Sequence, residues 1–166
     1  IKIDDKIRVL ELYHGPTLAF KDVGARFMAN CLNYFNKKKK HNSTILVATS
    51  GDTGAAVANG FLGVNGTQVV ILYPNGKVSD VQERQLTTNG KNIIALKVDG
   101  TFDDCQKIVK KAFLDNDLNN VLNLTSANSI NIARWLPQAF YYFFAYKDFK
   151  KEKNNSKQLC ISVPSG

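Results

Sequence analysis

One lysine in the sequence stands where its amine could act as a nucleophile. Lys21 closes the stretch YHGPTLAFK, whose Gly-Pro pair is typical of a turn. Apolar residues recur at helical spacing from Phe20 onward, which predicts a helix that begins near Lys21, with Thr17 as its N-cap. The positive end of that helix and the apolar neighbours disfavour an ammonium, so they favour the free amine that Schiff-base chemistry requires. The plain alternative is a solvent-facing lysine at a helix start.

A first polar loop could bind an anion near such an amine. It follows an apolar run that is typical of a strand buried on both faces, and it precedes a predicted helix. Its backbone amides and hydroxyls could form an anion cradle at the helix N-terminus, although an ordinary helix cap would use similar residues. The residues of this loop are Thr49, Ser50, Gly51, Asp52 and Thr53.

A second polar loop covers residues 125–131, which are rich in small polar side chains and include Asn128 and Ser129. Arg134 follows it at the beginning of the next predicted helix, where its guanidinium could bind a phosphate through two N–H groups. An N-cap followed by a surface arginine is the alternative. Two anion-binding loops and a lysine at a helix start together indicate an amine that works on an anionic small molecule.

Composition and charge narrow the class of protein. The 166 residues suffice for one ordinary domain, and we expect neither a membrane span nor a signal peptide, since no apolar run approaches the roughly 20 residues that a span needs. The net charge of +8 arises largely from lysines at predicted helix ends, near residues 37–40 and 147–157. These runs lack interleaved aromatic residues, so we expect no nucleic-acid partner. A phosphorylated small molecule suits the basic charge.

The number and spacing of the cysteines indicate the cellular compartment of the protein. Cys31, Cys105 and Cys160 are odd in number and widely spaced, which fits neither a disulfide framework nor a metal motif. We therefore expect a cytoplasmic protein in which Cys31 and Cys105 are small core residues. The sequence indicates no oligomeric state.

Strand-like apolar runs alternate with helical patterns along the chain. Strands are predicted over residues 44–49, 69–73, 92–98, 121–124 and 159–163. Helices are predicted over residues 54–62, 79–89, 101–113 and 131–149, in addition to the one that begins near Lys21. Residues Ser79 to Gln82 form a capping-box pattern, and Thr101 is a further predicted cap. This βαβ series predicts an α/β fold with an open, mainly parallel sheet and helices on both faces. The polar loops fall at the carboxyl ends of strands, where ligands bind in such sheets.

We expect three parts in the chain. Residues 1 to about 42 form a lysine-bearing segment and helix, residues 43–150 form a small α/β domain, and residues 151–166 form a linker and a further strand. The last strand runs into Pro164-Ser165-Gly166, which calls for a loop and a helix beyond it, so we interpret the chain as a piece of a longer protein.

Three motifs, in the same order along the chain, closely resemble those of the threonine synthase family. Members of that family are pyridoxal-phosphate enzymes of fold type II. The motifs are HGPTLAFKD at residues 14–22, ATSGDTGAA at 48–56 and SANSIN at 126–131. VPSG at 163–166 is similar to the beginning of that family's glycine-rich loop for the cofactor phosphate. The resemblance runs along the whole chain. It implies conversion of O-phospho-L-homoserine and water to L-threonine and phosphate.

The resemblance also implies roles for single residues. Lys21 matches the Schiff-base lysine, and Phe20, Asp52 and Gly166 are the further expected cofactor contacts. The loop from Thr49 to Thr53 matches the site of the substrate α-carboxylate. Asn128, Ser129 and Arg134 match positions that hold the substrate phosphate. Members of the family are considerably longer, so we expect the present chain alone to be inactive.

Other functions stay open on the sequence. Another fold type II enzyme, such as a threonine or serine dehydratase or a cysteine synthase, would use unphosphorylated substrates. A noncatalytic anion-binding α/β module would not need Lys21. A basic nucleic-acid binder would show binding with a steep salt dependence.

Overall fold

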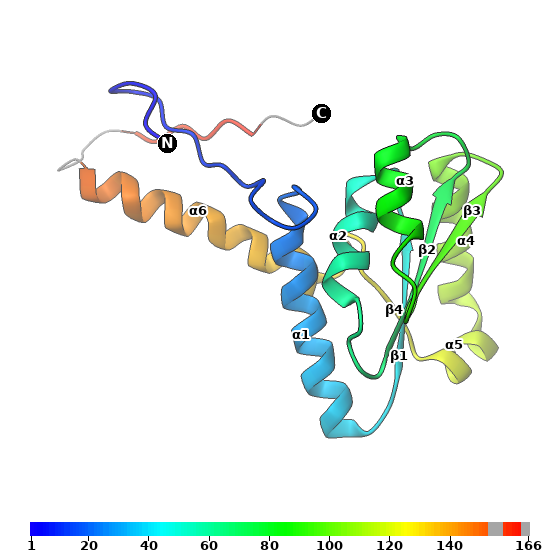
Figure 1. The fold of residues 1–166 in the computed structure, drawn as a ribbon. Helices are drawn as coiled ribbons and strands as arrows, with labels where there is room; N and C mark the ends of the chain where they lie inside the picture. Colours follow the sequence, from blue (N-terminus) through cyan, green and yellow to red (C-terminus); the bar gives the residue numbers. More distant parts are fainter. Residues whose placement is uncertain (153–157, 164–166) are drawn as a thin grey trace.

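The protein folds around a parallel sheet with helices on both faces, as a computed structural model that describes residues 1–152 and 158–163 shows (Figure 1). Its strands are β1 (Ser43–Ala48), β2 (Thr67–Pro74), β3 (Ile93–Val98) and β4 (Leu124–Ser126). Its helices are α1 (Lys21–Lys39), α2 (Asp52–Phe61), α3 (Asp80–Thr87), α4 (Phe102–Leu114), α5 (Asn116–Leu122) and α6 (Ile132–Glu152). The predicted fold class is confirmed.

The order of the strands creates a switch point beside β1. The sheet runs β3-β2-β1-β4 and every pairing is parallel. The chain therefore moves outward from β1 through β2 to β3 and then returns to the opposite side of β1 to form β4. In open α/β sheets, ligands bind outside the carboxyl ends of the strands at such a reversal. The two polar loops follow β1 and β4, so the topology brings them to this point.

Every residue of β1 is buried, and the strand is covered on both faces. Ile45 and Val47 belong to one buried cluster with residues of α1 and α2, whereas Leu46 and Ala48 belong to another with residues of α4. Figure 1 shows the same layering, with α1, α2 and α3 on one side of the sheet and α4 on the other. Each fully buried aliphatic side chain contributes about 1.5–3 kcal/mol relative to exposure, so this layering fixes the strand ends that carry the loops.

The predicted strand at residues 121–124 is wrong in its first half. Val121 and Leu122 end α5, and the strand begins only at Leu124. Local capping explains the difference. Asp115 accepts a hydrogen bond from the Leu118 amide at 2.9 Å and so starts a helical turn. Its end is set by Asn123, whose left-handed backbone (φ 46°, ψ 62°) closes α5.

The predicted strand at residues 159–163 is also wrong, because the structure assigns no strand there. A strand needs a neighbour for its backbone hydrogen bonds, and none of the described strands pairs with this segment.

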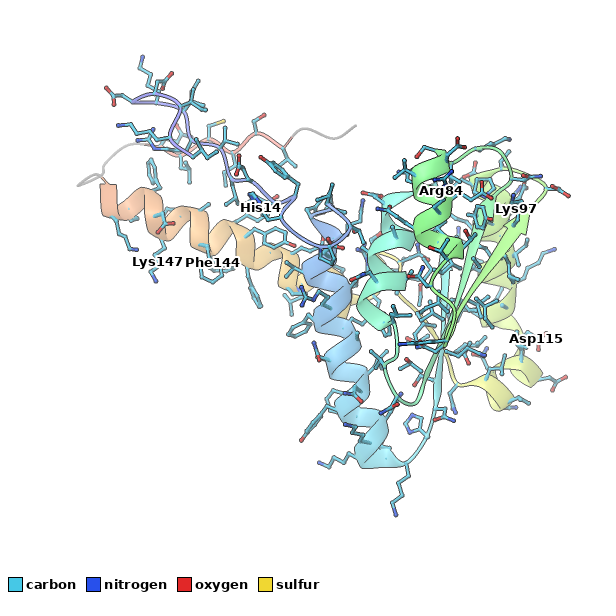
Figure 2. The ribbon with its side chains drawn as sticks, viewed as in Figure 1. His14, Arg84, Lys97, Asp115, Phe144 and Lys147 are labelled. Atoms are coloured by element: carbon cyan, nitrogen blue, oxygen red, sulfur yellow. The ribbon has the colours of Figure 1, made fainter. Side chains whose placement is uncertain are left out.

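The aromatic side chains of α6 are largely exposed. Phe144 is 65% exposed and projects from the part of α6 that extends away from the sheet (Figures 1 and 2). Of the predicted core cysteines, Cys105 is buried and Cys31 is half-buried. In the part of the chain that the structure describes, we find no helix with the length and apolar character needed to cross a bilayer.

Candidate active site

The turn before α1 is shaped by a buried carboxylate. Asp22 is only 3% exposed and accepts hydrogen bonds from the Thr17 amide at 3.0 Å and the Thr17 hydroxyl at 2.5 Å. The prediction that Thr17 is the N-cap is therefore wrong. That position belongs to Phe20, which makes no side-chain cap. Gly15 packs against the same carboxylate, because a Cβ there would lie 2.2 Å from Asp22 Oδ2. This packing places Lys21 as the first residue of α1.

The amine of Lys21 bridges α1 and α2. Its Nζ lies 2.6 Å from Asp52 Oδ2, and the Lys21 side chain is only 20% exposed. The same Nζ lies 4.7 Å from the centre of the Phe20 ring. This ion pair ties the start of α1 to the start of α2. The predicted site residues Lys21, Phe20 and Asp52 thus lie together.

The first polar loop is organised by one buried hydroxyl. Thr49 Oγ1 accepts hydrogen bonds from the Gly51 amide at 3.0 Å and the Gly54 amide at 2.9 Å. Gly51 adopts φ +156°, a conformation that side chains disfavour, and supplies no side-chain cap to α2. The amides of Asp52 and Thr53 have no hydrogen-bond partner among the described residues. The positive end of α2 is therefore open to an anion, beside the exposed Ser50.

The second polar loop is joined to the first by Asn128. Its Oδ1 accepts a hydrogen bond from the Ala48 amide at 3.1 Å, and its Nδ2 donates one to the Ala48 carbonyl at 2.8 Å. The side chain thereby continues the β1–β4 ladder, whose last strand pair is Leu46 with Ser126. Asn128 thus holds the two loops in register. Ser129, which follows it, is exposed.

Arg134 is buried with unused hydrogen-bond donors. It is 4% exposed, and neither Nε nor Nη1 has a partner among the described residues. Burial lowers the pKa of the Arg134 guanidinium, while the negative charge of Asp52 and the ionised form of Tyr141 act in the opposite direction. A buried cation with free N–H groups is costly unless it binds an anion. The residue therefore points to an anion-binding role at this edge of the sheet.

Close packing between α1 and α6 places Arg134 near the start of α1. A Cβ on Gly24 would lie 2.1 Å from the Arg134 carbonyl oxygen, so only glycine allows this crossing. Two helical turns after Arg134, the Tyr141 hydroxyl donates a hydrogen bond to the Phe20 carbonyl. Burial, with the Asp22 carboxylate nearby, raises the pKa of Tyr141 to about 12. The sequence reasoning did not identify Asp22 and Tyr141, because their roles depend on these contacts.

A hollow of about 420 Å³ lies beside this cluster. The turn before α1, Asp52 and the first turns of α3 line it, with Val81, Gln82 and Gln85 on the α3 side. Its volume falls in the range of small-molecule sites. The sequence reasoning identified Gln82 only as part of a helix cap and did not identify Gln85.

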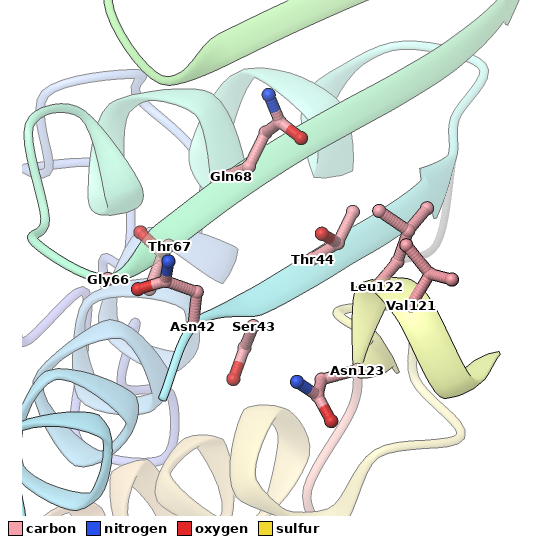
Figure 3. Close-up of a pocket in the computed structure, with 9 residues that line it drawn as sticks. All are labelled: Asn42, Ser43, Thr44, Gly66, Thr67, Gln68, Val121, Leu122 and Asn123. Atoms are coloured by element: carbon pink, nitrogen blue, oxygen red, sulfur yellow. The ribbon is translucent and has the colours of Figure 1, made fainter. Parts of the chain in front are cut away.

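A second hollow, of about 390 Å³, lies at the amino ends of β1 and β2 (Figure 3). It is lined by amide, hydroxyl, glycine and aliphatic residues and has no acidic or basic side chain. Two of its hydroxyls are used internally: Ser43 donates to Asn36 Oδ1 at 3.1 Å and Thr67 donates to the Val64 carbonyl at 2.7 Å. This hollow has no group that could activate a nucleophile.

His14 lies on the segment before α1 (Figure 2). Its Nε2 is 2.9 Å from Glu11 Oε2, so His14 pairs with a side chain. Among residues 1–152 and 158–163, no group of three or more metal-ligating side chains gathers. Gly166 lies outside the described residues.

Comparison with known families decides the class of protein. Residues 4–154 match the family described as pyridoxal-phosphate dependent enzyme. The chain belongs to this family. Threonine synthase from Buchnera aphidicola (subspecies Acyrthosiphon pisum) is 54% identical over 166 residues, which are all of this chain and 38% of that protein. The chain thus spans little more than a third of the length of this curated relative.

Solved structures of pyridoxal-phosphate enzymes share the fold. The threonine synthase from Brucella melitensis, a structure with bound pyridoxal phosphate, superposes with a TM-score of 0.83 at 46% identity. That match covers 90% of this chain and 32% of the other. The threonine synthase from Escherichia coli gives a TM-score of 0.79 at 53% identity, over 87% of this chain and 33% of the other.

The residues present fit the cofactor of this family. Pyridoxal phosphate needs an amine for its aldehyde and a site for an anion. Lys21 offers the amine, the hollow beside Asp52 offers space, and the unused donors of Arg134 and α2 offer binding to anions.

Proposed function

We propose that this chain is the lysine-bearing part of a threonine synthase, which converts O-phospho-L-homoserine and water to L-threonine and phosphate with pyridoxal phosphate. The buried guanidinium of Arg134, with two unused donors, carries the proposal. It gives a phosphorylated substrate an anion site at the same strand edge as Lys21. The similarity to threonine synthases over the whole chain supports the same function.

The bound cofactor would supply the electron sink for carbanionic charge on an amino acid. In our proposal Lys21 holds the cofactor through its amine and then moves protons at the α, β and γ carbons of the substrate. Asp52, 2.6 Å from Nζ, keeps the amine in place between the two helices. Asp52 and Phe20 would also contact the cofactor, and Gly166, by its resemblance to the family's motif, would contribute to binding of the cofactor phosphate.

The two polar loops would bind the two anionic ends of the substrate. The open amides at the start of α2, in the loop from Thr49 to Thr53, receive the α-carboxylate. Arg134 and Ser129 bind the phosphate, and Asn128 contributes by holding the loop on Ala48. Retaining the released phosphate would favour addition of water at the β carbon over escape of a keto acid.

The setting of this enzyme follows from the same proposal. We place it in the cytoplasm, with a small-molecule substrate and with neither nucleic acid nor membrane as a partner. Residues 1–42 would form the lysine-bearing segment, residues 43–150 the small domain and residues 151–166 the connection to the rest of the protein.

Borohydride reduction tests the role of Lys21. The full-length protein is mixed with pyridoxal phosphate, reduced and mapped by peptide mass, and the adduct is expected on Lys21 alone. Lys21→Ala should lower the rate of threonine and phosphate formation by about a thousandfold or more, the scale of lost proton transfer and covalent catalysis. Lys107→Ala on α4 serves as the control, since Lys107 is exposed and lies in an ion pair with Asp104.

Three outcomes would contradict the proposal. An adduct scattered over surface lysines would leave Lys21 without a special role. Full threonine formation by Lys21→Ala would exclude Lys21 from the catalytic residues. Turnover of threonine or serine with O-phospho-L-homoserine ignored would favour a dehydratase. The present chain alone should form no threonine, and measurable formation would refute that expectation.

A further inference from the structure

Gln82 is fixed at one end by the cap of α3. It is the third residue of that helix, and its Oε1 accepts hydrogen bonds from the Ser79 amide at 3.3 Å and the Ser79 hydroxyl at 3.2 Å. The backbone N–H of Gln82 in turn donates to Ser79 Oγ at 3.3 Å. These contacts set the orientation of the carboxamide. Its Nε2 makes no hydrogen bond with the described residues, so two N–H groups remain to be used.

The free end of the carboxamide lies against the loop that opens α2. A Cβ on Gly51 would be 2.4 Å from Gln82 Nε2, so the glycine permits the two segments to touch. Gln82 also lines the 420 Å³ hollow together with Phe20 and Asp52. Its donors therefore lie against Gly51, the residue that precedes the open amides of Asp52 and Thr53, although they come from a different helix.

The cap alone does not explain why residue 82 is glutamine rather than glutamate. A capping box accepts glutamate or glutamine equally well, and the positive end of a helix favours glutamate. What distinguishes glutamine is the neutral N–H donor in place of a second anionic oxygen. A donor that faces open helix amides adds to an anion site, whereas a carboxylate there would repel the ligand.

We propose that Gln82 is a substrate-binding residue whose Nε2 donates a hydrogen bond to the substrate α-carboxylate at the start of α2. This inference rests on the proposed function. It extends the carboxylate site from the loop after β1 to the first turn of α3 and makes α3 part of the selection of amino-acid substrates.

The variant Gln82→Glu separates binding from capping. Glutamate keeps an oxygen for the Ser79 cap but replaces the donor with a negative charge. In the full-length enzyme with pyridoxal phosphate, we expect the KM for O-phospho-L-homoserine to rise about ten- to hundredfold, the scale of a lost hydrogen bond to a charged group. The Kd for the product L-threonine, measured by titration calorimetry, should rise by a similar factor. The kcat and the melting temperature should stay near those of the unaltered protein.

Gln68→Glu provides a matched control. Gln68 is exposed at the amino end of β2 and lines the other hollow (Figure 3), so the same chemical change falls at the opposite edge of the sheet. Its KM and Kd should not change. An equal rise in both variants would indicate a general charge effect and overturn the inference.

The remaining outcomes are equally decisive. If the unaltered protein forms threonine, unchanged KM and Kd in Gln82→Glu would overturn this inference and leave the proposed function intact. This holds whether or not the melting temperature changes. Absence of threonine formation by the unaltered protein overturns the proposed function and this inference together.

Discussion

The helices α2 and α4 both begin after the carboxyl end of a strand, and their first turns are built in opposite ways. In α4, Thr101 Oγ1 accepts a hydrogen bond from the Asp104 amide at 3.2 Å, and Asp104 Oδ2 accepts one from the Thr101 amide at 2.9 Å. The bond from the Thr101 amide, with further ones from the Thr101 hydroxyl and Lys107, lowers the pKa of Asp104 to about 2. The helix thus carries its own anion at its positive end.

In α2 the corresponding place is left open. Its N-cap is Gly51, which has no side chain to offer, and the carboxylate of Asp52 in the first turn pairs with Lys21. The hydroxyl of Thr49, from the preceding loop, holds the backbone without covering the amides of Asp52 and Thr53. A cap of its own would stabilise α2 by about 1 kcal/mol. The contrast shows one helix start built for stability and another kept available for a ligand.

Among the variants that test this contrast, Arg134→Met should lower activity most, and an unaltered activity would contradict the idea that this part of the site is kept available for a ligand. We expect Arg134→Met to lower kcat/KM about a hundredfold or more, since charge-assisted hydrogen bonds to phosphate contribute about 1.5–3 kcal/mol each. The melting temperature should be unchanged or higher, because the variant removes a buried cation with unused donors. Steady-state kinetics and thermal unfolding measure the two effects.

Arg84→Met, on the exposed face of α3 (Figure 2), is the control and should leave kcat/KM unchanged. Strong destabilisation of Arg134→Met with little loss of kcat/KM would show that Arg134 serves the fold rather than a phosphate.

The two threonines that organise these helix starts give the next effect in size. Thr49→Val leaves two buried amides without an acceptor, at about 1–3 kcal/mol each, and should lower kcat/KM about tenfold or more by deforming the loop. Thr101→Val removes an ordinary cap and should cost about 1 kcal/mol with no change in kcat/KM. Urea unfolding and steady-state kinetics distinguish the variants. Equal losses of activity in both would remove the difference between α2 and α4.

The smallest effect concerns the pH dependence of stability. The pKa of Asp104 is lowered on folding from 3.8 to about 2, so its stabilising contribution is complete above pH 3.8 and is lost as the pH falls through about 2. The difference in unfolding free energy between the unaltered protein and Asp104→Asn should therefore shrink between about pH 4 and pH 2. Asp103→Asn, in the same helical turn, is the comparison variant. A difference for Asp104→Asn that does not vary with pH would contradict the expectation.

Local signals in the sequence were sufficient to predict where several helices begin. The capping box at Ser79 and the cap at Thr101 predicted the starts of α3 and α4, because both partners of each cap lie within one helical turn. The predicted capping failed at Thr17, where the threonine binds a buried aspartate instead of capping α1. The predicted strand at residues 121–124 failed since Asp115 and Asn123 favoured a helical turn over the strand propensity of valine.

The sequence by itself determined the α/β class, a lysine at the first position of a helix and two polar loops after buried strands. Each of these depends on residues that are close along the chain. The tertiary structure decided which groups meet: Lys21 with Asp52, Asn128 with Ala48, and Gln82 with Gly51. It also decided that Arg134 is buried with unused donors. These contacts join segments that meet only when β4 returns beside β1 and when α1 packs on α2 and α6, and no local pattern encodes that packing.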